Sequence, residues 1–335
     1  TRSAPVGGVS LNGLAEYGSL DSSRLSAQAL TTAGNVELVA TSGWMRSEGI
    51  DSFSGRGDRD GFDHRNASLK AVYRPTEGIE LGTVAHWVEG ESEFDGFDPV
   101  TFRHADTLDS TRNRIGAVRT WAEFERGGWP GRLEGSFLAS ANRNLLATEP
   151  LNRTSGRRFS VGAQLSRETD RHLVTLAAEH QGEDFRARDQ ASFGAADQDR
   201  SRDLAAAVVQ WRAEWFPWLT TDLALRHDSF SAFDDATSAR AGATVTPAER
   251  LSVIAGYGEG IAQPTFYDLF GFFPGTFKGN PGLGPERSRE WYLGVRWDGG
   301  SRLGLWLQGF SGTLREEIID VFDPATFRST TANAP

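Results

Sequence analysis

Cysteine is absent from this chain of 335 residues, and methionine occurs only once. Without cysteine, the protein has neither a disulfide framework nor a thiolate metal site. Long apolar runs are missing as well, since the most apolar stretch, 204–209, is far shorter than the roughly 20 residues that a transmembrane helix requires. These absences exclude a helical membrane protein, but they leave open a protein that crosses a membrane with strands.

Basic residues are outnumbered by acidic ones, with 35 Lys and Arg against 45 Asp and Glu and a net charge of −10. Phosphate binding requires a basic face, so we predict no nucleic-acid partner. The six histidines never occur in a metal-ligand spacing such as His-Glu-x-x-His, and no pair of carboxylates stands out as a glycosidase site. We therefore predict that the chain is not an enzyme.

Aromatic residues are abundant, with 10 Trp and 21 Phe, although only 38% of the chain is hydrophobic. Its mean hydropathy is correspondingly low, at −0.42. This combination suits a protein whose apolar residues form a thin outer skin. In a transmembrane barrel the lumen face is polar, so the average hydropathy stays low although the protein lies in lipid.

Apolar and polar residues alternate along most of the chain, as they do in half-buried β-strands. Segments of this kind recur about fifteen times, each roughly ten residues long, which is the length that a tilted membrane strand needs. Four sets of apolar residues that share one strand face are Ile79, Leu81, Ala85 and Trp87; Ala205, Ala207, Val209, Trp211, Ala213 and Trp215; Leu251, Val253, Ala255 and Tyr257; and Trp291, Leu293, Val295 and Trp297.

The connections between these segments alternate in length. Short joints lie near 33–35, 75–78, 126–131, 169–171, 216–218, 246–250 and 298–301, and mostly longer polar loops lie near 48–64, 91–111, 143–156, 183–200 and 261–286. The loops near 19–23 and 230–236 are shorter exceptions. Tight turns on one side and extended loops on the other are typical of outer-membrane barrels. The sequence therefore predicts an all-β fold, an antiparallel transmembrane β-barrel.

Two stretches carry a resemblance to a known family. Residues 257–264 leave one amphipathic strand, an aromatic loop follows, and residues 279–290 enter the next strand through a Pro-Glu-x-Ser step at Pro285–Ser288. Together with a first strand ending in Glu16-Tyr17-Gly18-Ser19, this pattern resembles TonB-dependent receptors of the cobalamin and siderophore branch. Members of that family usually have about 22 strands.

The resemblance implies that residues 1–335 form a partial TonB-dependent receptor β-barrel domain, without the plug domain and the C-terminal strands. It implies a bacterial outer-membrane receptor that binds and imports a scarce nutrient, cobalamin or a ferric siderophore. The implied partners are the TonB complex of the inner membrane, acting through the plug, the lipopolysaccharide and other outer-membrane lipid, and the small-molecule ligand. We expect a monomer. The alternatives are a passive porin and a secreted all-β adhesin or glycan-binding protein.

Acidic residues at alternate positions form a candidate metal site. Asp58-Arg59-Asp60-Gly61-Phe62 resembles a step that binds calcium in the second outer loop of cobalamin transporters, and Ca²⁺ takes six to eight oxygen ligands. No cofactor is required by this interpretation, but a structural calcium ion is expected. The candidate ligands are Asp51, Asp58, Asp60 and Asp95. Alternatively, these residues form a solvated acidic loop, with Arg56 and Arg59 neutralising the carboxylates.

The aromatic loop is the candidate substrate-binding site. An exposed group of aromatic rings could stack on a corrin ring or a catecholate and exclude water. Alternatively, the same rings pack against neighbouring loops or against a plug. The candidate substrate contacts are Phe266, Tyr267, Phe270, Phe272, Phe273 and Phe277.

Overall fold

The computed structural model describes residues 8–53, 57–98, 100–101, 103–147, 149–190, 193–271, 277–300 and 303–334. In this part of the chain, fifteen strands are hydrogen-bonded in chain order, β1 to β15, in one sheet, and β16 and β17 form a second sheet. Neighbouring strands such as β1 and β2, β4 and β5, and β13 and β14 pair antiparallel, so the predicted all-β antiparallel fold is confirmed. The prediction of about fifteen strands fits the large sheet, to which the terminal hairpin adds two. Over the described residues, no helix is sufficiently long and apolar to cross a bilayer.

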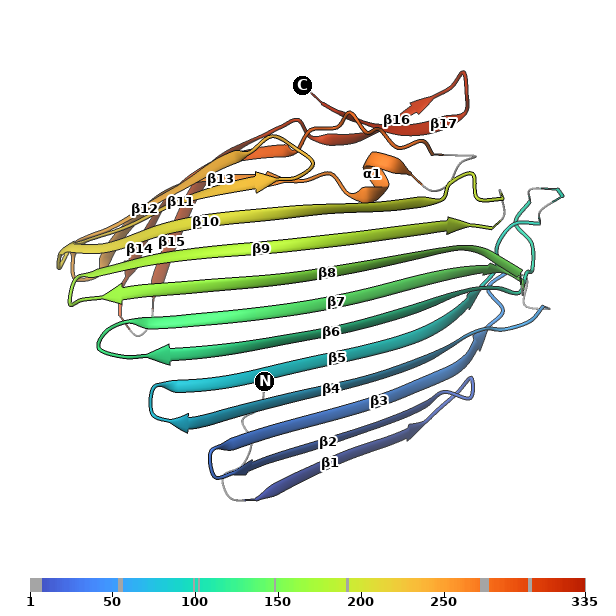
Figure 1. Ribbon diagram of the computed structural model, residues 1–335, viewed down its shortest axis with the longest axis horizontal. Coiled ribbons are helices and arrows are strands. Elements are labelled where there is room, and N and C mark those ends of the chain that lie inside the picture. The colour runs from blue at the N-terminus through green and yellow to red at the C-terminus, as the bar shows by residue number, and fades with distance from the viewer. Residues whose placement is uncertain are drawn as a thin grey trace. The chain divides into compact units, whose positions relative to one another are not determined.

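The chain divides into two compact units. The first comprises residues 1–123, 134–160 and 183–201, and the second comprises 124–133, 161–182 and 202–335. Strands β1 to β5 lie side by side in the first unit (Figure 1). Their bounds are β1 Val9–Tyr17, β2 Ser23–Ala33, β3 Val36–Ile50, β4 Asp60–Thr76 and β5 Ile79–Phe94. Strands with residues in both units are β6 Asp109–Glu125, β7 Pro130–Leu146, β8 Glu149–Glu168, β9 His172–Asp189 and β10 Gln198–Phe216.

The two faces of the first unit's sheet differ sharply in chemistry, because side chains along a strand point alternately to either face. Cross-strand partners on one face, which we call the apolar face, form the row Leu11, Ala29, Ala40, Leu69 and Ala85. The adjacent row on the other face, the polar face, is Asn12, Gln28, Thr41, Ser68 and His86. Leu11 and Leu69 remain 74% and 47% exposed, so the apolar face lies on the surface of this unit and not in a core.

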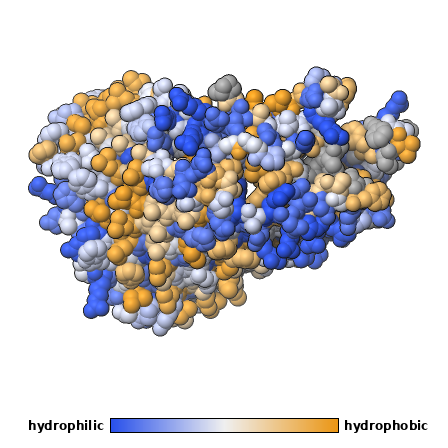
Figure 2. Space-filling view, turned by 45° about the horizontal axis from the view of Figure 1, so that its top comes forward, coloured by the Kyte–Doolittle hydropathy of each residue, from blue (hydrophilic) through white to orange (hydrophobic). Residues whose placement is uncertain are grey.

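The second unit contains the remaining elements: β11 Leu219–Phe230, β12 Ala236–Ala248, β13 Leu251–Ala262, α1 Phe266–Phe270, β14 Glu286–Asp298, β15 Gly304–Arg315, β16 Ile318–Asp323 and β17 Arg328–Asn333. Its sheet also has an apolar face, on which one cross-strand row is Leu219, Val245, Val253, Val295 and Leu307. Figure 2 shows hydrophobic side chains gathered in broad patches on the surface in view.

Tight joints connect the strands at one end, as the sequence predicted. Gly34 and Gly78 have φ angles of 57° and 77°, a left-handed conformation that glycine adopts without steric cost. At the turn between β10 and β11, Phe216 stacks on Trp218 with ring centroids 5.2 Å apart. Both rings are about half exposed, which fits an aromatic girdle better than a buried cluster. The opposite strand ends, which join the longer loops, are called the outer ends below.

The strands are longer than predicted. Strand β8 has 20 residues and β10 has 19, so the predicted length of roughly ten residues is wrong for them. At about 3.3 Å per residue, twenty residues extend roughly 66 Å, more than a tilted strand needs to cross a bilayer. The extra length lies partly at the outer ends, where ion pairs such as Arg112–Glu91 and Arg114–Glu89 connect neighbouring strands. Backbone pairing therefore continues past the apolar rows.

Candidate functional site

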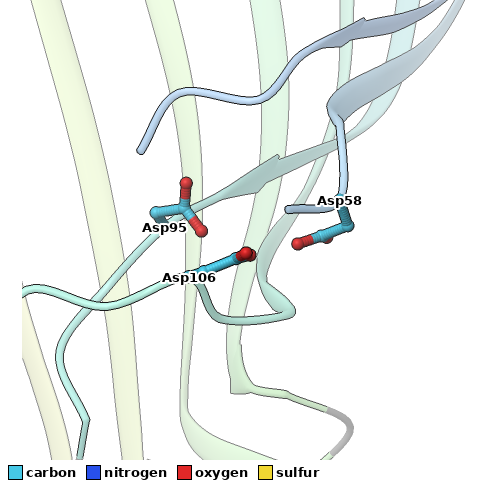
Figure 3. A group of neighbouring side chains, drawn as sticks. All are labelled: Asp58, Asp95 and Asp106. Atoms are coloured by element: carbon cyan, nitrogen blue, oxygen red, sulfur yellow. The ribbon is translucent and has the colours of Figure 1, made fainter. Parts of the chain in front are cut away.

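Three outer-end loop segments of the first unit bring carboxylates together. Asp58 precedes β4, Asp95 follows β5, and Asp106 precedes β6. One carboxylate oxygen from each lies within 4.8 Å of the others, and the three side chains point toward a common space (Figure 3). Oxygen-only ligands of this kind suit a hard cation such as Ca²⁺.

Hydrogen bonds from the loops hold this acidic cluster in place. The backbone N–H of Thr107 donates to Asp95 Oδ1 at 2.9 Å, and the Ser52 hydroxyl donates to Asp95 Oδ2 at 3.0 Å. Asp106 approaches so near to Gly57 that a Cβ at that position would overlap its carboxylate. The glycine is therefore needed for this close approach.

The acidic cluster is electrostatically unfavourable by itself. The hydrogen bond between Asp58 and Asp106 raises the pKa of Asp106, and burial and the negative charges of Asp58, Asp95 and Asp51 raise it further. Arg59 does not neutralise these charges, because its guanidinium pairs with Glu48 at 3.0 Å. Arg56 lies outside the described residues. A bound cation would favour the ionised form of all three carboxylates.

The predicted metal ligands separate into two groups. Asp58 and Asp95 lie in the acidic cluster, whereas Asp51 and Asp60 accept backbone hydrogen bonds that shape the loop before β4. Asp60 Oδ2, for example, accepts from the N–H of Ser52 at 2.9 Å. The sequence prediction missed Asp106, because its immediate neighbours in the sequence, Ala105 and Thr107, are not acidic. It lies eleven residues beyond Asp95. Only the folding of the loop brings it back to Asp95.

The aromatic loop of the second unit contains the helix α1, which the sequence prediction missed. Thr265 is its N-cap, and Asp268 completes a capping box in which each side chain accepts from the other residue's backbone N–H. The two backbone hydrogen bonds measure 3.1 Å and 2.8 Å. This local pairing explains why a five-residue helix forms without a longer apolar periodicity.

The predicted substrate contacts form two ring pairs. Tyr267 stacks on Phe277 with centroids 4.3 Å apart, and Phe277 is only 8% exposed. Phe266 lies beside Phe270 at 6.4 Å, and the guanidinium of Arg202 lies 4.6 Å from the centroid of the Phe266 ring. The structure thus brings Phe266 and Phe270 together in half-buried positions. Phe272 and Phe273 lie outside the described residues.

The hairpin of β16 and β17 fixes the aromatic loop, and α1 lies beside β17 (Figure 1). The Thr331 hydroxyl donates to the carbonyl of Asp268 at 3.0 Å, and Asn280 Nδ2 donates to the carbonyl of Thr331 at 2.9 Å. Asn333 exchanges hydrogen bonds with the backbone of Gly284. The loop is consequently a defined surface that presents aromatic rings and the cation of Arg202.

A groove lies along β1 to β4 in the first unit, with a volume of about 730 Å³. Its polar lining residues include Asn12, Arg24, Gln28, His64 and Asn66. These side chains belong to the polar face, and the volume lies within the usual range of roughly 300–1,000 Å³ for small-molecule sites. The polar face can therefore contact a hydrated solute.

Comparison with known proteins identifies the family. Residues 10–335 match the family described as TonB dependent receptor-like, beta-barrel. No curated protein matches the chain. Among solved structures, the siderophore receptor PirA from Pseudomonas aeruginosa is similar, with 16% identity and a TM-score of 0.76 over 97% of this chain and 60% of that one.

Two further structures share the fold. The ferric enterobactin receptor PfeA from Pseudomonas aeruginosa, in complex with enterobactin, is 13% identical with a TM-score of 0.75, over 100% of this chain and 60% of that chain. The copper transporter OprC is 13% identical with a TM-score of 0.72, over 99% and 58% of the respective chains. The chain thus spans about three-fifths of these proteins. It belongs to the TonB-dependent receptor-like β-barrel family and is a protein of the bacterial outer membrane.

Proposed function

We propose that this chain forms barrel wall and outer loops of an active-transport receptor, which imports a scarce nutrient with energy from the TonB complex of the inner membrane. The observation that carries the proposal is the aromatic loop between β13 and β14, which hydrogen bonds from β17 fix at the outer end of the barrel wall. A fixed aromatic surface binds a flat or ring-bearing ligand with little loss of conformational entropy.

A ferric siderophore is the ligand class that we favour over cobalamin. Phe266 presents its ring beside the cation of Arg202, a combination suited to an anionic aromatic ligand such as a ferric catecholate. PirA and PfeA are siderophore receptors by name, which supports the same class. Cobalamin, which is largely uncharged, would contact the aromatic rings but would gain little from the charge of Arg202.

Replacing Phe266 and Phe270 together by alanine is expected to weaken ligand binding roughly thirtyfold or more, because each lost aromatic contact is worth about 1 kcal/mol. Binding of ferric enterobactin and of cobalamin to the complete receptor in detergent would be measured by fluorescence quenching. Phe216→Ala, at the opposite strand ends, is the matched control and should leave affinity unchanged.

Uptake measurements separate the receptor from a passive porin. A receptor concentrates the ferric siderophore only in cells with a functional TonB complex, whereas a porin admits it with or without TonB. Equal uptake in both strains, or unaltered affinity in the double variant, would contradict the proposed function.

We also propose that the acidic cluster binds calcium and thereby orders the outer loops of the first unit. Its support is the convergence of Asp58, Asp95 and Asp106 and the raised pKa of Asp106. Calcium would be held by these three carboxylates, with further oxygens from water or neighbouring carbonyls completing its shell.

Asp106→Asn is expected to weaken calcium binding at least about tenfold, since affinity follows the number of charged ligands. Asp60→Asn is the matched control, because Asp60 begins β4 only two residues after Asp58 but accepts a hydrogen bond from Ser52 instead of joining the cluster. Calorimetric titration of the complete receptor would measure both. Equal losses in the two variants would place the cation elsewhere in the loop.

Calcium affinity should also fall on acidification. Calcium binds the ionised carboxylates, and the pKa of Asp106 is raised, so protonation competes at a pH above the ordinary aspartate value of about 4. Repeating the titration from pH 7 downward therefore gives a progressive loss in the wild type. A wild-type affinity that is constant down to pH 4 would contradict the assignment of Asp106.

A further inference from the structure

On the apolar face of β14, apolar side chains give way to arginines toward the outer end of the strand. From the short-turn end outward, its residues on that face are Trp297, Val295, Leu293, Trp291, Arg289 and Arg287. Trp291 and Leu293 are 62% and 56% exposed, as lipid-facing side chains of a barrel are. The seven residues from Trp291 to Trp297 span about 20 Å, comparable to the apolar band between two aromatic girdles. The two arginines consequently lie just beyond the lipid tails, at headgroup level.

Neighbouring strands add to this charge. Arg315 is the cross-strand partner of Arg287, and Thr313 is the partner of Arg289. Together with Thr237, Ser288 and Glu259 they line a pocket of about 190 Å³. Below the pocket, Tyr257 and Trp291 pack with ring centroids 4.3 Å apart and form an aromatic floor on the lipid side.

The pocket carries excess positive charge. Arg289 pairs with Glu259 at 3.3 Å, and the Tyr257 hydroxyl donates to the same carboxylate. Within the described ranges, neither Arg287 nor Arg315 takes part in an ion pair, and both are exposed. One carboxylate therefore faces three guanidinium groups, which leaves two positive charges uncompensated.

Arginines at the outer ends of β4 to β6, on the apolar face of the first unit, lack this excess. Arg65, Arg112 and Arg114 pair with Asp63, Glu91 and Glu89 at 3.1, 2.8 and 2.9 Å. The pairing there shows that this protein can neutralise its outer-end arginines with its own carboxylates. The imbalance on β13 to β15 is consequently a local property.

We propose that this arginine pocket binds the phosphate of a phosphorylated outer-leaflet lipid headgroup. The inference rests on the membrane location of the barrel and is independent of the imported nutrient. Guanidinium groups bind phosphate oxygens through paired N–H donors, and the hydroxyls of Thr237 and Thr313, on the same face as the arginines, supply further donors. The volume corresponds to roughly six water molecules, which suits a phosphate group and is too small for a whole siderophore or corrin.

The test uses the complete receptor in detergent and three probes: a fluorescent diphosphorylated lipid A, the same lipid after removal of its phosphates, and inorganic phosphate as competitor. The wild type should bind the phosphorylated lipid at least tenfold more tightly than the dephosphorylated one. In Arg287→Gln/Arg289→Gln/Arg315→Gln, affinity for the phosphorylated lipid should fall on the order of a hundredfold, at about fivefold per arginine. Its affinity for the dephosphorylated lipid should not change.

The matched control is Arg65→Gln/Arg112→Gln/Arg114→Gln, which removes the same charge from the same kind of face at outer strand ends. It should change lipid affinity less than about threefold, because those arginines are already paired. Glu259→Gln should have the opposite effect. Removing the one carboxylate of the pocket should strengthen binding of the phosphorylated lipid about fivefold. This single variant tests the site even where the triple variant does not fold, which heat-modifiable migration on a gel would reveal.

An equal loss in the control triple variant would show a general effect of surface charge and overturn the proposal. Equal affinity for the dephosphorylated lipid, or no strengthening in Glu259→Gln, would overturn it as well. Full displacement of the lipid by millimolar inorganic phosphate would make the pocket a small-anion site and not a lipid site.

Discussion

Arginine in place of Ala29 is expected to destabilise the barrel by about 2–4 kcal/mol, the cost of a cation near the bilayer midplane on a lipid-facing strand. Ala29 lies in the middle of an apolar cross-strand row between Leu11 and Ala40. The arginine would have no aqueous neighbour within the row, and its flexible chain would have to reach past adjacent rows to a headgroup. Equilibrium urea unfolding of the complete receptor in lipid vesicles would measure the loss.

The matched control for this prediction is the adjacent residue. Gln28→Arg introduces the same side chain one position earlier, where it points to the opposite, polar face and into the groove along β1 to β4. We expect a change of less than about 0.5 kcal/mol there, as for other polar surface positions. Similar losses at the two positions would show that the face assigned to lipid is wrong.

Gly279→Ala is expected to unfold the aromatic loop locally. A Cβ at Gly279 would overlap backbone atoms of Phe270 and Gly271, which cannot move aside as a flexible side chain can. The cost to the loop is about 3 kcal/mol or more, and ligand affinity should fall on the order of a hundredfold with it. Hydrogen exchange should then accelerate at the amides of Gly271 and Asn280, which donate to Tyr267 and Asp268 in the folded loop.

Gly284→Ala serves as the control for Gly279→Ala. Gly284 lies in the same loop, but the nearest atom to a Cβ there is the Asn333 side-chain oxygen at 4.0 Å. Ligand affinity and amide exchange should therefore remain as in the wild type. If Gly279→Ala behaved like Gly284→Ala, the loop would not be held as tightly as the hydrogen bonds indicate.

Strand faces could be predicted from the sequence because they depend on a local rule. Trp291, Leu293, Val295 and Trp297 alternate with polar residues, and one shift of register would expose the wrong side of the whole strand. The observed register places Val295 opposite Val253 and Leu307, so the apolar face continues across neighbouring strands. The alternation of short joints and longer loops also indicated which end of each strand is the outer end.

The candidate sites were less predictable, because they depend on contacts between distant segments. The Asp58-x-Asp60 spacing suggested that both residues bind one cation, but the structure turns Asp60 toward Ser52 and brings Asp106 to Asp58 instead. The arginine pocket combines β12, β13, β14 and β15, and its charge imbalance is visible only after each guanidinium has been matched with its carboxylates. A capping box was readable in Thr265 and Asp268, yet a five-residue helix gives no periodicity to detect.

The hydrogen bonds between the aromatic loop and the β16–β17 hairpin join residues 49 to 63 positions apart. Loop grafting between barrels must take this separation into account. Transplanting residues 263–285 alone would leave Asn280 and Gly284 without Thr331 and Asn333, and the graft would lose its shape together with its specificity. The smallest transferable module comprises both segments, so exchange of ligand preference between such receptors requires a two-piece transfer.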